Sequence, residues 1–199
     1  MKNWTSIILA LTLVISAFLI LPVHAATGVY DSVIRLHVLA NSDTEEDQAI
    51  KLKVRDAVLA HTGTLLENVS TKEEAEEILN QNLEQIRAVS EQTLREIGAP
   101  NTVQVTLTVE DYPRRTYEQA ALPAGEYLSL RVMIGEAEGQ NWWCVLFPQM
   151  CLSTASAERE ASCLAAGLSE GQYRFITQSD GTGYRVRFKL VEMVEGMLG

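Results

Sequence analysis

The chain changes its hydrophobic period twice, and this order of patterns constrains the fold more than any other feature. Residues 33–41 (VIRLHVLAN) alternate apolar and polar side chains, which is typical of a β-strand with one buried face. Helical periodicity then runs over residues 44–97, and alternation returns in residues 102–109 (TVQVTLTV). Further extended segments follow at residues 127–134 and 142–147. This order predicts a single α+β domain, in which the N-terminal strand and two long helices pack on a mostly antiparallel sheet.

The first predicted helix spans residues 44–60. Two capping boxes are available before it, because Ser42 with Glu45 and Asp43 with Glu46 both have the required spacing. One face of this helix carries a row of charges at four-residue spacing, with the acid before the bases: Asp47, Lys51 and Arg55. That order favours ion pairs on a solvated helix face. Gly63 is expected to end the helix.

A second helix is predicted to begin at a Ser70 cap and to run unbroken to Ile97. Residues 156–168 predict a short helix. Residues 173–177 (YRFIT) and 184–194 (YRVRFKLVEMV) are predicted to be strands that an Asp-Gly turn separates.

The N-terminus has the layout of a secretory signal. An apolar run over residues 7–21 is followed by Val23 and Ala25, the small residues that precede a signal cleavage site. The run is shorter than the roughly 18 residues expected of a membrane-spanning helix. Two outcomes stay open. Either cleavage after Ala25 leaves residues 26–199 as one exported domain, or residues 1–25 remain as an uncleaved anchor.

The charge of the chain limits its partners. The formal net charge is −10, which repels the phosphate backbone of nucleic acids and the surface of anionic lipids. The sequence therefore predicts no nucleic-acid binding. Membrane contact is expected only through the signal segment or through a partner protein.

A catalytic role for Cys144 would need a base beside the thiol. Beyond residue 25 only His37 and His61 are available, and both are predicted to be partly exposed and outside any catalytic sequence context. The acidic run at residues 41–48 (NSDTEEDQ) lacks EF-hand spacing, and no His and Cys pairs occur at metal-ligand spacing. The sequence thus predicts no catalytic residue, no metal site and no cofactor. An exported hydrolase that uses Cys144 is kept as an alternative.

Two of the three tryptophans lie side by side in residues 139–151 (GQNWWCVLFPQMC). On a strand, Trp142 and Trp143 must point to opposite faces. One of them then belongs to the core, and the other is either covered or exposed. An exposed tryptophan is typical of an anchor in a protein–protein interface.

The same segment holds two of the three cysteines. Pro148 could turn the chain and bring Cys144 and Cys151 within bridging distance, and a disulfide is expected to be tolerated in an exported protein. A pair of small buried thiols is the alternative. Cys163 is expected to be a buried free thiol.

Three blocks of the chain carry a resemblance to a known family: RLHVLANSDTEEDQAIKLKVRDAVL (35–59), LPAGEYLSLRVMIGEAEGQNWWCVLFPQMC (122–151) and VRFKLVE (186–192). Behind an export signal and in the same order, they resemble the stage II sporulation protein R family of endospore-forming bacteria. The strings ANSD…DQ…K…VRD and G…NWWCVLFP are long and unusual. The chain departs from the family where Pro148 is followed by Gln149 instead of a second proline.

The resemblance implies a signalling protein rather than an enzyme. In that family, the forespore exports the protein into the space between the forespore and mother-cell membranes. There the protein triggers a membrane-embedded aspartic protease of the mother cell, which cuts the inactive precursor of sporulation sigma factor E. The expected partner of this chain is therefore a membrane-embedded aspartic protease.

The hypothesis of a docking protein gives several residues a candidate role. Trp142 or Trp143 is the first choice as the anchor. The second choices are the turn and helix face described above: Asn41, Asp43, Asp47, Lys51 and Arg55. Ordinary capping and a solvated helix face are the alternatives for these five. A passive envelope or spore-assembly protein is a further alternative for the whole chain.

Overall fold

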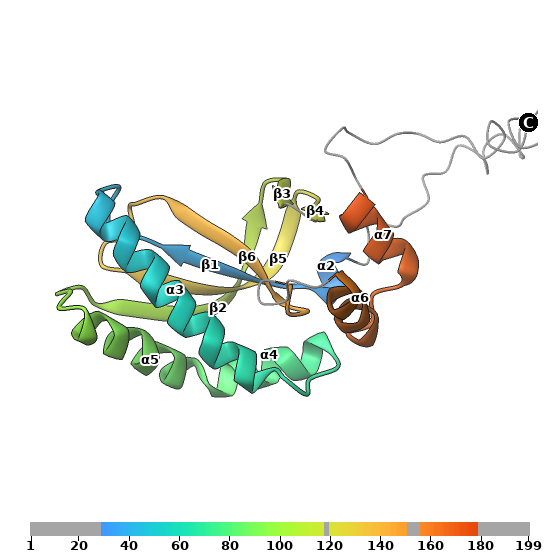
Figure 1. Cartoon of the computed structure of the whole chain (residues 1–199), viewed down its shortest axis with the longest axis horizontal. Helices are drawn as coiled ribbons and strands as arrows, with labels where there is room; N and C mark the ends of the chain where they lie inside the picture. Colours follow the sequence, from blue (N-terminus) through green and yellow to red (C-terminus); the bar gives the residue numbers. More distant parts are fainter. Residues whose placement is uncertain (1–28, 118–119, 151–155, 179–199) are drawn as a thin grey trace, which may run out of the picture. The chain divides into compact units, whose positions relative to one another are not determined.

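The computed structural model describes residues 29–117, 120–150 and 156–178. The strands are β1 (Ile34–Leu39), β2 (Val103–Tyr112), β3 (Arg115–Tyr117), β4 (Ala120–Leu122), β5 (Gly125–Ile134) and β6 (Asn141–Phe147) (Figure 1). The helices are α2 (Val29–Ser32), α3 (Glu45–Leu65), α4 (Lys72–Gln81), α5 (Leu83–Glu96), α6 (Ser156–Ala165) and α7 (Glu170–Gln178). The predicted signal segment, residues 1–25, and the predicted strand at residues 184–194 lie outside the described residues.

Four strands form the main sheet in the order β2-β5-β1-β6. β1 runs parallel to β5, whereas the pairs β1–β6 and β2–β5 are antiparallel. The strands β3 and β4 form a second, antiparallel sheet. The predicted α+β fold with a mostly antiparallel sheet is confirmed. β1 and β5 can be parallel because three helices and the strands β2, β3 and β4 lie between them in sequence, and parallel pairing needs such a long connection.

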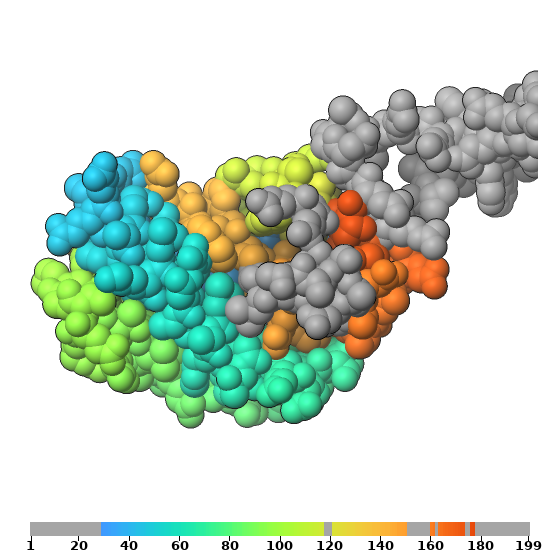
Figure 2. Space-filling view, in the orientation of Figure 1, coloured from blue at the N-terminus to red at the C-terminus, as the bar shows by residue number. Residues whose placement is uncertain are grey.

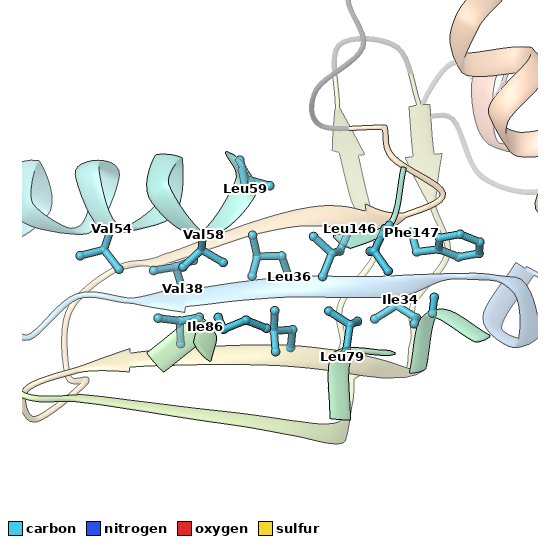
Figure 3. Close-up of a cluster of buried hydrophobic side chains, with 14 of the residues drawn as sticks. Ile34, Leu36, Val38, Val54, Val58, Leu59, Leu79, Ile86, Leu146 and Phe147 are labelled. Atoms are coloured by element: carbon cyan, nitrogen blue, oxygen red, sulfur yellow. The ribbon is translucent and has the colours of Figure 1, made fainter. Parts of the chain in front are cut away.

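The core lies between the main sheet and the helices α3, α4 and α5. Ile34, Leu36 and Val38 of β1 are fully buried and belong to one cluster with Val54 and Val58 of α3. Figure 3 shows Val54 and Val58 of α3 facing Leu36 and Val38 of β1, and it also shows Leu79 of α4 and Ile86 of α5. The alternation in β1 therefore places its apolar side chains as predicted, against the helices.

Helix α3 has a different cap and a later end than predicted. Thr44 caps it, because Thr44 Oγ1 accepts the Asp47 N–H at 3.2 Å. The predicted caps at Ser42 and Asp43 are wrong. The helix also continues through Gly63 to Leu65. The side chain of the next residue, Leu66, is buried in the core. Burial of that side chain outweighs the helix penalty of about 1 kcal/mol for a glycine.

Two helices, α4 and α5, occupy the region where the sequence predicts one. Asn82 separates them with a backbone conformation of φ −111° and ψ 10°. Its Nδ2 donates to the Ile78 carbonyl at 2.7 Å, so the side chain caps the end of α4. The cap at the start of α4 is Thr71 and not Ser70.

Both faces of β1 are buried, although the sequence predicts one buried face. Arg35 is 0% exposed and His37 is 8% exposed, so the prediction of a partly exposed His37 is wrong. A second cluster, which includes Tyr112 and Tyr127, covers this other face of the sheet. The period of a strand shows which face is apolar, but it does not show whether the polar face is covered.

The C-terminal part of the described chain contains a helix where a strand was predicted. Residues 173–177 belong to α7, while the predicted helix at residues 156–168 is confirmed as α6. A capping box starts α7, because Ser169 Oγ accepts the Gln172 N–H and Gln172 Oε1 accepts the Ser169 N–H. This Ser-x-x-Gln signal was present in the sequence, and it outweighs the short apparent alternation of YRFIT.

Candidate functional site

Most of the residues predicted to bind a partner gather at one end of the main sheet. There β1 ends, α3 begins, and the loop of residues 135–140 leads from β5 into β6. The first turns of α3 and this loop lie side by side in the space-filling view (Figure 2). We name as the polar junction the five residues whose side chains tie this region together: Asn41, Ser42, Asp43, Asp47 and Lys51.

Asn41 connects the end of β1 to both neighbours. Its Oδ1 accepts the Glu136 N–H at 3.1 Å, and its Nδ2 donates to Asp47 Oδ2 at 2.9 Å. Its backbone carbonyl accepts the Glu138 N–H at 3.3 Å. Asn41 therefore has a structural role, because one side chain bonds the loop and helix α3 at the same time.

Asp43 and Lys51 complete the junction by binding Gln140, the last residue of the loop. Asp43 Oδ1 accepts the Gln140 N–H at 2.7 Å, and Lys51 Nζ donates to the Gln140 carbonyl at 2.9 Å. Both backbone groups of one loop residue are thus held by α3 and its preceding turn. Burial, with a smaller contribution from Arg55, lowers the pKa of Lys51 from its usual value.

The predicted charge row on α3 does not form. Asp47 accepts hydrogen bonds from Ser42 Oγ at 2.5 Å and from Asn41. These hydrogen bonds lower the pKa of Asp47, and the bond from Ser42 has the largest effect. Lys51 is 5% exposed and points to the loop, so the prediction of a solvated face is wrong for it. Arg55 pairs with Asp56 at 2.7 Å instead of with its neighbours in the row.

Two glycines let the loop approach the end of β1. Gly135 has φ +59°, and a Cβ there would lie 2.1 Å from Asn41 Oδ1. A Cβ on Gly139 would lie 2.2 Å from the Ser42 carbonyl oxygen. A side chain at either position would force the loop away from the junction.

Trp142 follows Gln140 of the loop by two residues and is half-buried. It packs against the core under the helices, and the Arg55 guanidinium lies 4.9 Å from the centre of its ring. Trp143 packs on the opposite face of the sheet, as the alternation predicts. There the Arg115 guanidinium lies 3.9 Å from its ring, and the His37 ring lies 5.5 Å away. Both tryptophans are half-buried under an arginine, so neither is bare.

Sequence reasoning missed a cluster of aromatic and basic residues on the face that carries Trp143. The fully buried Arg35 guanidinium lies 4.0 Å from the Tyr112 ring and 5.0 Å from the Tyr127 ring. It also donates to the Tyr117 hydroxyl at 2.5 Å. Burial raises the pKa of both Tyr112 and Tyr117. The available signal was the set of tyrosines in the segments that became β2, β3 and β5.

His37 and Glu110 belong to a hydrogen-bonded group on the same face. His37 Nδ1 lies 3.2 Å from the Glu110 carboxylate, and His37 Nε2 lies 2.9 Å from Asn141 Oδ1. Arg131 Nε lies 2.9 Å from Glu110 Oε1. Burial alone would raise the pKa of Glu110, but the hydrogen bonds from His37 and Ser129 and the nearby charges outweigh it and lower the pKa.

The cysteines are placed in part. Cys144 is disulfide-bonded, and Cys163 is a free, buried thiol as predicted. Cys151 lies outside the described residues, so the pairing of Cys144 with Cys151 stays a prediction. Within residues 29–117, 120–150 and 156–178, no group of three His, Cys, Asp or Glu side chains is placed to hold a metal ion. No helix of these segments has the length and apolar character that crossing a bilayer requires.

Comparisons with known proteins agree on one family. Residues 30–157, which include the polar junction and both tryptophans of β6, match the family model of stage II sporulation protein R. The curated protein named stage II sporulation protein R of Bacillus subtilis (strain 168) is 37% identical over 121 residues. That alignment covers 61% of this chain and 54% of the relative, so the chain matches about half of the relative's length. No solved structure matches the chain.

Proposed function

The chain belongs to the stage II sporulation protein R family, and on that basis we propose that it is an exported signal that activates a membrane-embedded aspartic protease. The protease then cuts the inactive precursor of sigma factor E in the mother cell. The chain acts from the space between the forespore and mother-cell membranes, and it is an activator and not a catalyst. The observation that carries this proposal is the family match over residues 30–157.

The proposed mechanism is a shift of a conformational equilibrium. A bound protein can favour the active state of the protease only if it binds that state more tightly than the inactive one. The chain therefore needs a surface whose shape is fixed before binding. The polar junction supports this requirement, because hydrogen bonds from β1, α3 and the 135–140 loop hold that end of the sheet together.

We place the docking surface at Trp142 and Arg55. Tryptophan and arginine are enriched among the residues that dominate interface energies. Here the guanidinium lies over the ring at 4.9 Å, and both side chains are partly exposed. Trp143, which Arg115 covers in the same way, is the second candidate.

The alternative of a hydrolase with Cys144 as nucleophile has less support. A thiol nucleophile needs a base with a free ring nitrogen. His37 lies on the neighbouring strand, but Glu110 and Asn141 engage both of its ring nitrogens. Cys144 itself is disulfide-bonded.

A reconstitution in a non-sporulating host tests the proposal. The chain is co-expressed with the protease and the sigma precursor, and precursor shortening is followed by immunoblot. Shortening should require both the chain and its residues 1–25. If all three proteins are present and correctly located but the precursor stays intact, the activator function is wrong. Shortening without residues 1–25 would refute the export requirement.

Point variants then locate the surface. Trp142→Ala should abolish shortening while the protein remains folded and exported, and Trp142→Phe should keep part of the activity. Leu52→Ala is the control, because Leu52 is an exposed apolar residue on α3 that lies outside the core. Normal shortening with Trp142→Ala and with Trp143→Ala would rule out the tryptophan anchor. If the chain is instead a passive envelope protein, the precursor should stay intact with the native chain and with every variant.

A further inference from the structure

Strand β2 forms one edge of the main sheet. It pairs with β5 in an unbroken register from Val103 opposite Ile134 to Tyr112 opposite Gly125. Within the described part of the chain, no strand pairs with its other side (Figure 1). An edge strand of this length presents a row of backbone N–H and C=O groups that another strand can bind.

The hydrogen bond at the start of β2 shows which groups face outward. The Gly135 N–H donates to the Thr102 carbonyl at 2.9 Å, one step beyond the pair of Val103 with Ile134. Since the N–H and C=O of one residue point to the same side in an antiparallel ladder, even-numbered residues of β2 bond to β5. The odd-numbered residues therefore direct their backbone groups to the open edge, among them Leu107, Val109 and Asp111.

This edge lacks several of the features that usually protect one, although it carries two acidic residues, Glu110 and Asp111, near its C-terminal end. The sequence of β2, VQVTLTVEDY, contains no proline and no lysine, and its continuous register contains no bulge. Val109 is 59% exposed, although Val103, Val105 and Leu107 on the same face pack against the core under the helices. The open edge and the exposed valine therefore coincide near the C-terminal end of β2.

We propose that β2 pairs antiparallel with β2 of a second copy of this chain, with the two-fold axis at Val109. An axis through a residue keeps the helices of both copies on the same side of the joined sheet. The helices of each copy already cover this face over Val103–Leu107. An axis at Val109 lets the two sets of helices avoid each other and covers the exposed valine.

The residues that meet in this register are compatible. Val109 lies opposite Val109 of the second copy, Leu107 opposite Asp111, and Thr108 opposite Glu110. No like charges lie directly opposite each other, an arrangement that would destabilise the pair. The outward backbone groups of Leu107, Val109 and Asp111 then bond across the axis. The inference does not depend on the proposed function.

Cysteine cross-linking of the full chain tests the register. Residues opposite each other in a hydrogen-bonded antiparallel pair have Cα atoms about 5.5 Å apart, which a disulfide can bridge. Val109→Cys should therefore form covalent dimers when a thiol oxidant is added. Thr106→Cys is the matched control: it is exposed on the same strand, but its two copies would be six residues apart, or roughly 20 Å. The chain without an added cysteine gives the background.

Disruption of the edge tests the interface itself. Val109→Lys should reduce the dimer fraction about tenfold or more in sedimentation equilibrium, because a lysine blocks edge pairing. Leu52→Lys, a change at a residue 40% exposed on α3, should leave the dimer unchanged. Circular dichroism confirms that both variants fold. The proposal is overturned if the native chain is monomeric or if Thr106→Cys cross-links as well as Val109→Cys. It is also overturned if Val109→Cys cross-links to a different protein or to another segment of the same chain.

Discussion

Replacing Asn41 with alanine should destabilise the protein measurably. The change removes the hydrogen bond from the Glu136 N–H, a neutral bond of about 1 kcal/mol. It also removes the bond to the Asp47 carboxylate, where bonds to charged groups contribute about 1.5–3 kcal/mol. The lower end of that range applies, because the junction is partly exposed to solvent. The expected loss in the free energy of unfolding is about 2–3 kcal/mol.

Urea unfolding followed by circular dichroism at neutral pH measures this loss. Thermal unfolding should show a midpoint about 4–12 °C lower. Asn101→Ala is the control, because the Asn101 side chain makes no hydrogen bond among the described residues, and it should change stability by less than about 0.5 kcal/mol. A double-mutant cycle with Asp47→Ala should give a coupling energy above about 0.5 kcal/mol. A loss below about 0.5 kcal/mol for Asn41→Ala would refute the structural role of the junction.

Two further changes test the junction and the half-buried Glu110. Gly135→Ala should destabilise the fold by more than Gly98→Ala: both glycines have positive φ, but a Cβ at Gly135 would clash with Asn41, whereas nothing lies within 4 Å at Gly98. Equal urea midpoints for the two variants would contradict the clash. The pKa of Glu110 is lower in the folded state than its ordinary value of 4.5. Its ionised form therefore stabilises the protein at a pH above 4.5, and this contribution is lost as the pH falls through the folded-state pKa. The native protein should therefore lose stability more steeply below about pH 4.5 than the Glu110→Gln variant. If the urea midpoints of the two proteins change in parallel with pH, the His37 contact does not stabilise the ionised carboxylate.

Local patterns in the sequence were enough for the elements themselves. The alternation in residues 33–41 and 102–109 identified the strands β1 and β2, and the switch in period identified the α+β class. Errors appeared where two local signals competed. The sequence offers Ser70 as a cap directly before Thr71, the true cap, and its helical pattern continues across Asn82, where the Asn82 side chain stabilises a break.

The candidate site was only partly accessible to such reasoning. Asn41, Asp47 and Lys51 are close in sequence, so their grouping on one turn and one helix face could be predicted. Their true contacts could not be predicted, because the loop that Asn41 and Lys51 bind follows β5, roughly ninety residues later. Trp142 comes to lie opposite Val38 of β1 only because β6 pairs antiparallel with β1.

The sequence alone therefore determined the family, the fold class and the apolar face of each strand, since these follow from periodicity and from long motif strings. The tertiary structure decided what covers the polar face. Arg35 and His37 have the spacing of solvent-facing residues in the sequence, yet β3 and the tyrosines of neighbouring strands bury them. A period records how one segment divides its own side chains between two faces. Burial depends on which other segments pack against each face, and those contacts join residues that are far apart in the chain.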